Sequence, residues 1–427
     1  PEEFKTEIYG VSEYASEDFN SIAPKYLRSL YLHGAHDIGH ALQDLALVGC
    51  SSMAVWGDKS EDGSLLIGRN FDFYAGDDFA KDKIILFVKP NKGIPYMSVT
   101  WGGMIGVLSG MNTEGLTVTI NAGKSDIPLV AKTPISIVTR EILQYASTIE
   151  EAIAIAKKRE VFVSESIMVG SAKDKKAVLI EMAPDNFDVY EVQNSSQLVC
   201  SNHFQSKAYQ SDERNVNHIK ESHSQYRFDR MNELLEEKDK MNPKKMAEIL
   251  RNKEGLAERN IGFGNEKSLN QLRAHHAVIF KPEQLMVWVS SNPYQLGEFV
   301  AYDLKEVFTK TKGDFTISAK VSENIAKDKF LETKEYVDYE KFRILDRKLE
   351  KVLKEKLTLE TGFAREYQSL NADFWLVYAR IGEYYYQRGW FKAAEVEFKK
   401  ALEKEITTVP DREKIEDYLK KINRKLG

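Results

Sequence analysis

The alternation of strand-like and helix-like segments constrains the fold of this 427-residue chain more than any other feature. Between residues 50 and 290, short β-prone runs punctuated by Gly, Asn and Asp are interrupted by segments with helical periodicity. Strands, paired helices and further strands that share one core predict a layered α+β fold. The helical segments are 134–145, 148–158, 226–237 and 243–252, and the strand-like runs are 52–56, 65–70, 84–88, 116–120, 166–170, 177–181, 187–192, 197–201, 277–280 and 285–290.

Helical segments flank this region on both sides. Residues 1–49 carry apolar stripes at helical spacing, and after about residue 335 the chain becomes helical and charged. We therefore expect three parts, namely a helical leader at 1–49, a central domain at 50–335 and a helical extension at 336–427.

The extension contains one unit whose small and aromatic residues stand at the spacings of a tetratricopeptide repeat of about 34 residues. A single repeat of this kind cannot bury its own faces, so packing against the central domain or neighbouring helices is favoured over partner binding or self-association. The residues concerned are Tyr378, Gly382, Tyr385, Gly389, Ala394, Phe398 and Ala401.

The bulk properties exclude several classes of function. The net charge is −5 with both signs mixed, so no basic excess for nucleic acid is visible. No apolar run is long enough to span a bilayer. No Gly-rich phosphate cradle follows a strand, so we expect no nucleotide cofactor. The chain starts at Pro1, which leaves the compartment open between an exported protein that has lost a signal peptide and a cytoplasmic one.

The two cysteines, Cys50 and Cys200, give no disulfide framework. Cys50 stands in a Gly-Cys-Ser-Ser context just ahead of a predicted strand. A free cysteine is most often a small buried hydrophobe, so this context alone says little. Two further motifs change its interpretation: Gly-Arg-Asn-Phe-Asp-Phe at 68–73 and Gly-Met-Asn-Thr-Glu-Gly-Leu-Thr-Val-Thr-Ile-Asn at 110–121.

Together these motifs resemble the choloylglycine hydrolase superfamily of N-terminal-nucleophile (Ntn) hydrolases. That group includes bile salt hydrolases, penicillin V acylases, acid ceramidase, N-acylethanolamine acid amidase and the acyltransferases that exchange penicillin side chains. The Cys-Ser-Ser and the motif at 68–73 match the opening hairpin, and residues 101–121 and 134–158 are similar to the acid ceramidase branch. The resemblance covers about residues 50–289 and implies a four-layer αββα sandwich.

The resemblance also implies particular site residues. Cys50 matches the nucleophile, and Arg69 and Asp72 match a charged pair beside it. Asn121 and Asn202 match asparagines of the oxyanion hole. A family arginine near the nucleophile matches Arg273 in the bile salt hydrolase pattern or Arg214 in the ceramidase pattern, and Arg273 is preferred.

The chemistry of an N-terminal cysteine agrees with these assignments. Its α-amine titrates at about 7.7–8, so the amine can accept the thiol proton without a histidine. Because an internal cysteine has no such amine, we expect self-cleavage between Gly49 and Cys50. Arg69 would lower the thiol pKa, and Asp72 could accept a hydrogen bond from the α-ammonium. Asn121 and Asn202 could each stabilise the oxyanion by roughly 2.7–4 kcal/mol.

Each assignment has a structural alternative. Arg69 and Asp72 could be an ion pair that only supports the fold, and the two asparagines could cap turns. The leader histidines His33, His36 and His40 could bind a metal, because the last two lie one helical turn apart. The Glu of a His-Glu-x-x-His motif is missing, so we expect packing of the leader and no metal.

Another pair, His275 and His276, opens a predicted strand and should point to opposite faces, so it is not a chelating pair. The function that the sequence favours is hydrolysis of a linear amide in an N-acyl substrate. An acyltransferase of the penicillin type and a non-catalytic binding protein are the alternatives. The aromatic residues Phe71, Phe73, Tyr74 and Trp101 could line an acyl pocket.

Overall fold

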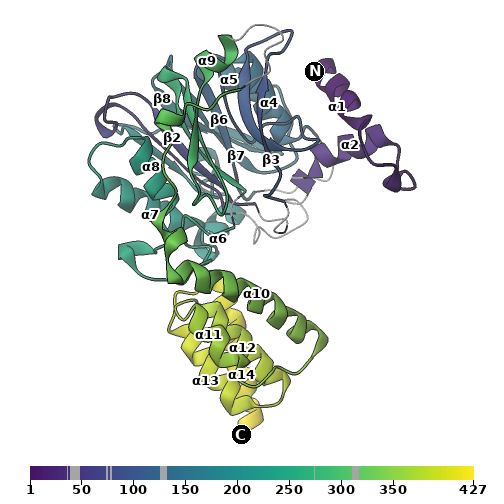
Figure 1. The fold of residues 1–427 in the computed structure, drawn as a ribbon, viewed down its shortest axis with the longest axis vertical. Coiled ribbons are helices and arrows are strands. Elements are labelled where there is room, and N and C mark those ends of the chain that lie inside the picture. The colour runs from purple at the N-terminus through teal and green to yellow at the C-terminus, as the bar shows by residue number, and fades with distance from the viewer. Residues whose placement is uncertain are drawn as a thin grey trace.

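The protein is described by a computed structural model that covers residues 1–35, 37–38, 49–73, 76, 79–125, 132–273, 275–309 and 317–427. Two antiparallel sheets form its centre, and a group of helices at the C-terminal end projects away from them (Figure 1). The first sheet has six strands in the order β10-β1-β2-β11-β12-β13. Its strands are β1 (Ser51–Val55), β2 (Leu66–Phe71), β10 (Gln197–Cys200), β11 (His276–Lys281), β12 (Met286–Ser290) and β13 (Phe299–Asp303).

The second sheet has seven strands in sequence order, so each strand pairs with the next one along the chain. The strands are β3 (Lys83–Val88), β4 (Tyr96–Trp101), β5 (Ser109–Asn112), β6 (Leu116–Ala122), β7 (Glu165–Ser171), β8 (Lys176–Ala183) and β9 (Asn186–Tyr190). The predicted strand runs all fall within or beside observed strands, whereas β4, β5 and β13 were not predicted.

Apolar side chains from both sheets meet in one buried cluster between them, to which Ile67 and Val278 of one sheet and Val99 and Met168 of the other belong. The outer face of the seven-stranded sheet is covered by α4 (Ile135–Tyr145) and α5 (Ile149–Ala156). The outer face of the other sheet is covered by α7 (Ser224–Glu237) and α8 (Pro243–Leu250). Helices outside two facing antiparallel sheets agree with the predicted layers.

The remaining short elements connect these layers. The predicted 277–290 hairpin is formed by β11 and β12, and Leu285 in the left-handed region closes its turn. The other helical segments are η2 (Gly57–Lys59), η3 (Lys207–Tyr209), α6 (Glu213–Glu221), η4 (Leu256–Glu258), η5 (Pro282–Gln284), α9 (Leu304–Thr309), η6 (Val321–Glu323) and η7 (Lys329–Glu332).

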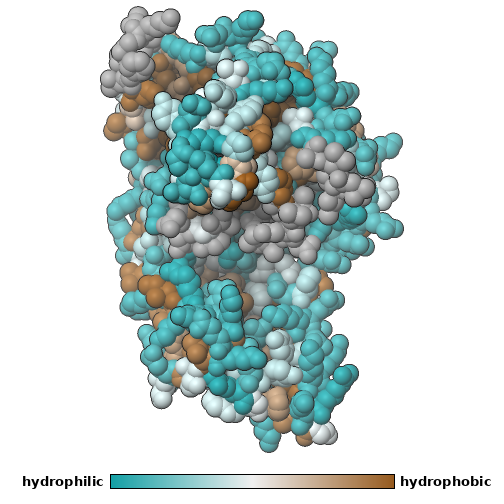
Figure 2. All heavy atoms as spheres, turned by 90° about the vertical axis from the view of Figure 1, so that its right-hand side faces the viewer, coloured by the Kyte–Doolittle hydropathy of each residue, from teal (hydrophilic) through white to brown (hydrophobic). Residues whose placement is uncertain are grey.

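The described part of the leader forms α1 (Glu2–Ser12), η1 (Glu17–Phe19) and α2 (Lys25–His33), which pack against α4 and the loop before β5. Glu7 pairs with the buried Arg140 at 2.7 Å, and His33 Nε2 accepts a hydrogen bond from the Ile105 amide at 3.0 Å. The expected packing of the leader is therefore observed. Much of the leader's outer side is apolar, and brown spheres lie among hydrophilic ones on this face (Figure 2). His36 and His40 lie outside the described residues.

The C-terminal extension is helical, as predicted, and has its own apolar core. Gly382 of α12 lies against Phe398 of α13, so close that an added Cβ would be 2.9 Å from its ring. The extension contacts the central region along residues 259–273; the side chain of Asn371, for example, accepts a hydrogen bond from the Phe263 amide at 3.0 Å. That the α12–α13 unit is a tetratricopeptide repeat stays a prediction. The helices of the extension are α10 (Lys334–Glu355), α11 (Phe363–Leu370), α12 (Trp375–Gln387), α13 (Phe391–Leu402) and α14 (Val409–Leu426).

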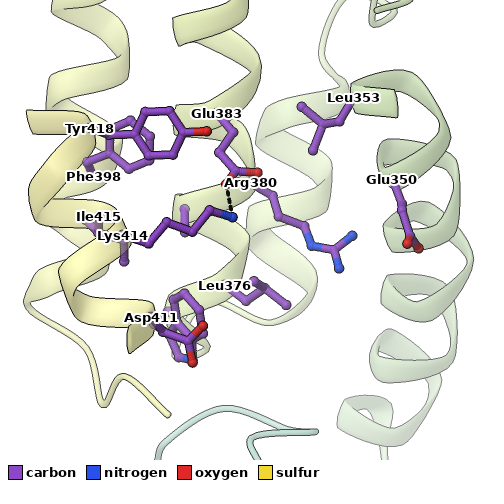
Figure 3. A pocket seen from close by; sticks show the side chains of 12 residues that line it. Glu350, Leu353, Leu376, Arg380, Glu383, Phe398, Asp411, Lys414, Ile415 and Tyr418 are labelled. Carbon is purple, nitrogen blue, oxygen red and sulfur yellow. Dashed lines mark ion pairs between the residues drawn. The ribbon is translucent and has the colours of Figure 1, made fainter. Parts of the chain in front are cut away.

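A pocket of about 300 Å³ lies between α10, α12 and α14 of the extension. Figure 3 shows Lys414 of α14 reaching Glu383 of α12, and these two side chains form an ion pair of 2.5 Å. Arg380 pairs with Asp346 at 3.3 Å. The pocket is lined by residues of the extension alone. Among the described ranges, no helix has the length and apolarity needed to cross a membrane.

Candidate active site

The Cys50 thiol lies directly before β1, the second strand of the six-stranded sheet. Cys50 is 1% exposed, and the register of β1 with β2 places Ser52 opposite Arg69. The Arg69 guanidinium therefore reaches back along the sheet, and its Nη2 lies 3.7 Å from Cys50 Sγ. It also donates to the carbonyl oxygens of Leu108 and Ile120 and to Ser109 Oγ, which fixes its position between the two sheets.

Burial governs the pKa of the Cys50 thiol. Loss of solvent raises this pKa above its ordinary value, and the positive charge of Arg69 offsets that rise only in part. Arg69 therefore acts on the thiol pKa in the expected direction, but burial outweighs it, so the net pKa of the enclosed thiol lies above its ordinary value. The desolvation of a fully enclosed thiol outweighs one neighbouring cation, so thiolate formation needs a base close by.

Asp72 supplies a buried carboxylate directly after β2. It is 2% exposed, and neither carboxylate oxygen has a hydrogen-bond partner among the residues that the structure describes. Burial raises the pKa of Asp72 to about 7, although Arg227, Arg69 and Arg273 act to lower it. Because Asp72 and Arg69 form no ion pair in the described structure, a purely structural salt bridge does not account for them. An unpaired buried carboxylate with a pKa near neutrality is a group that can exchange a proton.

The peptide bond between Gly49 and Cys50 is held on both sides. The Gly49 amide donates to the Asp72 carbonyl oxygen at 3.0 Å, and the Gly49 carbonyl accepts from Gln271 Nε2 at 3.0 Å. The Cys50 carbonyl accepts from Arg227 Nη1 at 2.5 Å. The residues that flank the predicted cleavage point are thus fixed by contacts to three different segments of the chain.

Arg227 of α7 contacts the backbone of Cys50. It is fully buried, and it also donates to Ser51 Oγ at 2.9 Å and to Asn202 Oδ1 at 2.5 Å. Burial lowers the pKa of Arg227 to about 10, so it stays charged at neutral pH. It lies on the buried side of α7 together with Ser224, Met231 and Leu234, and an arginine on that apolar stripe was the available sequence signal.

Arg273, the sequence-based choice for a site arginine, is placed differently from Arg227, and its role at the site stays a prediction. Arg273 pairs with Glu266 at 2.9 Å, although its charge still lowers the pKa of Asp72. Arg214, the other candidate, donates to the Ser125 carbonyl oxygen at 3.2 Å. Arg273 precedes the segment that forms β11, and Arg214 follows Asn202, so each fits one branch of the family pattern by spacing. The arginine that contacts the backbone of Cys50, however, is Arg227 on the buried face of α7.

The two predicted oxyanion asparagines lie beside each other near Cys50 but differ in their free donors. Both hydrogens of the Asn121 side-chain amide are taken, because Nδ2 donates to the carbonyl oxygens of Cys200 and Ser201 at 3.2 and 3.1 Å. Asn202 Nδ2 donates to the Ala122 carbonyl oxygen at 3.0 Å, which leaves one hydrogen. The placement of Asn121 links β6 to β10 and does not support its predicted oxyanion contact.

His275 and His276 meet each other, contrary to the expectation that they point to opposite faces. Their Nδ1 atoms are 2.8 Å apart, because His275 precedes β11 and is not held by the strand's alternation. His276 Nε2 lies 2.8 Å from Ser109 Oγ, the hydroxyl that accepts from Arg69. The histidines thus support the position of Arg69. No group of three or more metal-ligating side chains is found in the ranges that the structure describes.

Aromatic rings adjoin the nucleophile. Phe71 stacks on Phe73 with centroids 6.0 Å apart, and Phe79 contacts Trp101 at 4.9 Å. Phe73 and Phe79 also line a cavity of about 260 Å³ together with Arg273. Tyr74, the fourth predicted aromatic residue, lies outside the described residues.

Comparison with protein families gives one match over most of the central region. The family described as "Acyl-coenzyme A:6-aminopenicillanic acid acyl-transferase" matches residues 59–291. A curated relative from Archaeoglobus fulgidus, described as an uncharacterized protein, is 25% identical over 202 residues, which are 44% of this chain and 34% of the relative. The chain thus spans about a third of the length of that relative.

Solved structures with low sequence identity also align with the chain. The Caenorhabditis elegans N-acylethanolamine-hydrolyzing acid amidase ortholog is 20% identical, with a TM-score of 0.40, over 55% of this chain and 93% of that one. A mutant of the conjugated bile acid hydrolase from Clostridium perfringens is 15% identical, with a TM-score of 0.43, over 63% of this chain and 96% of that one.

Proposed function

The chain belongs to the acyl-coenzyme A:6-aminopenicillanic acid acyl-transferase family, and on this premise we propose that it is an Ntn amide hydrolase. It cuts itself between Gly49 and Cys50 and then uses the freed Cys50 to break the linear C–N amide bond of an N-acyl substrate. The observation that carries this proposal is the clamped Gly49–Cys50 peptide next to a buried, unpartnered carboxylate.

Self-cleavage starts from the thiol of the uncut chain. Asp72, whose carboxyl pKa is about 7, accepts the thiol proton, and Cys50 Sγ bonds to the Gly49 carbonyl carbon. The bond from that carbon to the Cys50 nitrogen breaks, and the nitrogen takes up the proton. Water then hydrolyses the Gly49 thioester, which releases a Gly49 carboxylate and restores the thiol.

Substrate cleavage uses the amine that this step creates. The Cys50 α-amine, with a pKa of about 7.7–8, accepts the thiol proton, and the Asp72 carboxylate holds the resulting ammonium. The thiolate attacks the substrate carbonyl, the amine leaves with the proton, and water hydrolyses the acyl thioester. The remaining hydrogen of Asn202 Nδ2 is available for the oxyanion, and Arg227 holds the Asn202 side chain in place.

An acyltransferase is the second candidate, because the family's description names that reaction. The same Cys50 thioester would then pass its acyl group to an amine or a thiol instead of water. A pure binding protein is less favoured, since the extension uses residues 259–273 of the central region as its packing surface. The aromatic rings of Phe73, Phe79 and Trp101 favour an apolar acyl chain on the substrate.

The experiment compares the wild-type chain with Cys50→Ala. Intact-mass analysis of the wild type is expected to show a leader that ends at Gly49 and a body that starts at Cys50, whereas Cys50→Ala stays one chain. The fragment that starts at Cys50 should hydrolyse N-acyl amides. Each added methylene of the acyl chain should raise kcat/KM, because its burial contributes up to about 0.8 kcal/mol of binding free energy. Adding free amines as acceptors separates hydrolysis from transfer. Turnover by an uncut wild type would contradict the proposal.

A further inference from the structure

Gln271 contacts the carbonyl group of the bond that self-cleavage would break. The side chain is 2% exposed, and its Nε2 lies 3.0 Å from the Gly49 oxygen although the two residues are 222 positions apart. We propose that Gln271 is the oxyanion donor of self-cleavage and that the C-terminal helices hold it at Gly49 through Leu272. This inference rests on the proposed self-cleavage and assigns it a residue that lies in no sequence motif.

The chemistry of the step calls for a donor at this position. When Sγ bonds to the Gly49 carbon, the carbonyl oxygen becomes negatively charged, and an N–H group already in place stabilises it without reorganisation. In the uncut chain, Asn121 donates to Cys200 and Ser201, and Asn202 donates one hydrogen to Ala122 and keeps the other for a substrate oxyanion. Gln271 is the side chain whose amide donates to this oxygen.

Gly49 leaves room for this contact. A Cβ added at Gly49 would lie 2.0 Å from Gln271 Nε2 and 2.6 Å from its Cδ. The φ angle of Gly49 is outside the left-handed region, so glycine is required here for space and not for backbone conformation. A side chain at this position would push the Gln271 amide off the carbonyl oxygen.

The extension fixes the residue that follows Gln271. Leu272 is fully buried in the same apolar cluster as Tyr339 and Phe342 of α10, and Tyr339 Oη donates to the Leu272 carbonyl oxygen at 3.3 Å. Leu272 has a φ of 52°, a conformation that a leucine adopts only when its surroundings impose it. The helices of the extension therefore hold Gln271 at the Gly49 carbonyl through its neighbour Leu272.

The first test is a time course of cutting after cell-free synthesis of full-length chains. Gln271→Met and Gln271→Glu remove the donor and should slow the appearance of the body by about a hundredfold or more. Gln295→Met is the matched control, because Gln295 is also fully buried but binds the Leu250 carbonyl oxygen. Circular dichroism checks that each variant folds. Cutting of Gln271→Met at the wild-type rate would overturn the inference, whereas a wild type that never cuts would contradict the proposed function.

The second test uses the crowding at Gly49 and the contact to the extension. Gly49→Ala should slow cutting in the wild-type background but add little to Gln271→Ala, where there is no amide to displace. Leu272→Ala should slow cutting about tenfold, with unchanged turnover per processed chain. If it fails to fold, Tyr339→Phe gives a milder slowing. If the effects of Gly49→Ala and Gln271→Ala on the rate of cutting were additive in the double variant, the donor assignment would be overturned. Unchanged cutting in both Leu272→Ala and Tyr339→Phe would overturn the role of the extension.

Discussion

The carboxylate beside Cys50 and the charged side chains of the extension pocket differ in how they are partnered. Asp72 is enclosed beside Cys50 with no hydrogen-bond partner in the described ranges, and burial raises its pKa to about 7. In the extension pocket, Glu383 is paired with Lys414 at 2.5 Å (Figure 3), and the lining residue Arg380 is paired with Asp346 at 3.3 Å. One region encloses a carboxylate without a hydrogen-bond partner among the described residues, and the other pairs its partly exposed charges with one another.

The difference has an energetic meaning. Burying a carboxylate without a partner costs folding free energy, so such a group persists where its proton is needed. A paired charge at a solvent-reached surface contributes little to stability or chemistry. We therefore expect substitutions near Cys50 to affect chemistry strongly and substitutions in the extension pocket to affect it very little.

The largest effect is expected for Arg227→Met. The variant removes the charged donor from the Cys50 carbonyl and from Asn202, so cutting and turnover should fall by about 10²–10³-fold, the range for loss of one preorganised donor. Arg230→Met is the matched control, because Arg230 is equally buried on the same helix but pairs with Glu233 and Glu258. Rates per folded molecule should be compared; equal losses in both variants would mean that Arg227 only supports α7.

Asp72→Asn should change stability in a pH-dependent way. The folded pKa of about 7 lies above the ordinary 3.8, so the folded protein binds this proton more tightly than the unfolded chain does. The stability of the parent chain is therefore lost as pH rises from about 4 to about 7. In the uncut Cys50→Ala background, Asp72→Asn should gain roughly 2–4 kcal/mol at pH 8 and little at pH 4.

Asp62→Asn provides the control with the opposite sign. The hydrogen bond and charge of Lys281 act to lower the pKa of Asp62, which lies below its ordinary value despite the opposing effect of burial. Its contribution is present at neutral pH and lost as pH falls, so the Asn variant should never be the more stable one at pH 8. Thermal unfolding between pH 4 and pH 8 measures both variants. A flat difference between Asp72→Asn and its parent would show that the carboxylate is not titrating.

The smallest effect is expected in the extension pocket. The Lys414 side chain is 62% exposed and that of Glu383 is 19% exposed, so solvent reaches their ion pair from the lysine side. Glu383→Gln should change the free energy of unfolding by less than about 1 kcal/mol and leave both cutting and turnover unchanged. Denaturant melts and the amide assay are sufficient. A clear loss of activity would mean that the extension pocket takes part in function and that the contrast between the two regions is false.

Sequence patterns predicted most of the strands and helices, because hydrophobic periodicity is a local property of the chain. The helix within 148–158 was predicted from its periodicity, and in the structure the Thr148 side chain caps it by accepting a hydrogen bond from the Glu151 amide at 3.2 Å. Strands such as β5, with four residues and a glycine, carry too little local signal and form because β4 and β6 pair with them. Pairing with the neighbouring strands, and not the composition of β5 itself, therefore fixes this strand.

The candidate site likewise contains residues that a local hairpin places and residues that only tertiary contacts place. The nearness of Cys50, Arg69 and Asp72 follows from a short hairpin whose register is set over a few residues, so the sequence by itself determined it. Arg227 and Gln271 reach the Gly49–Cys50 peptide from 177 and 222 residues away, and only the tertiary structure decided that. It also decided that Asn121 has no free donor and that the pKa of Asp72 lies near 7. The physical reason is that burial and pairing depend on every segment that closes around a group, whereas a motif describes only its own neighbours.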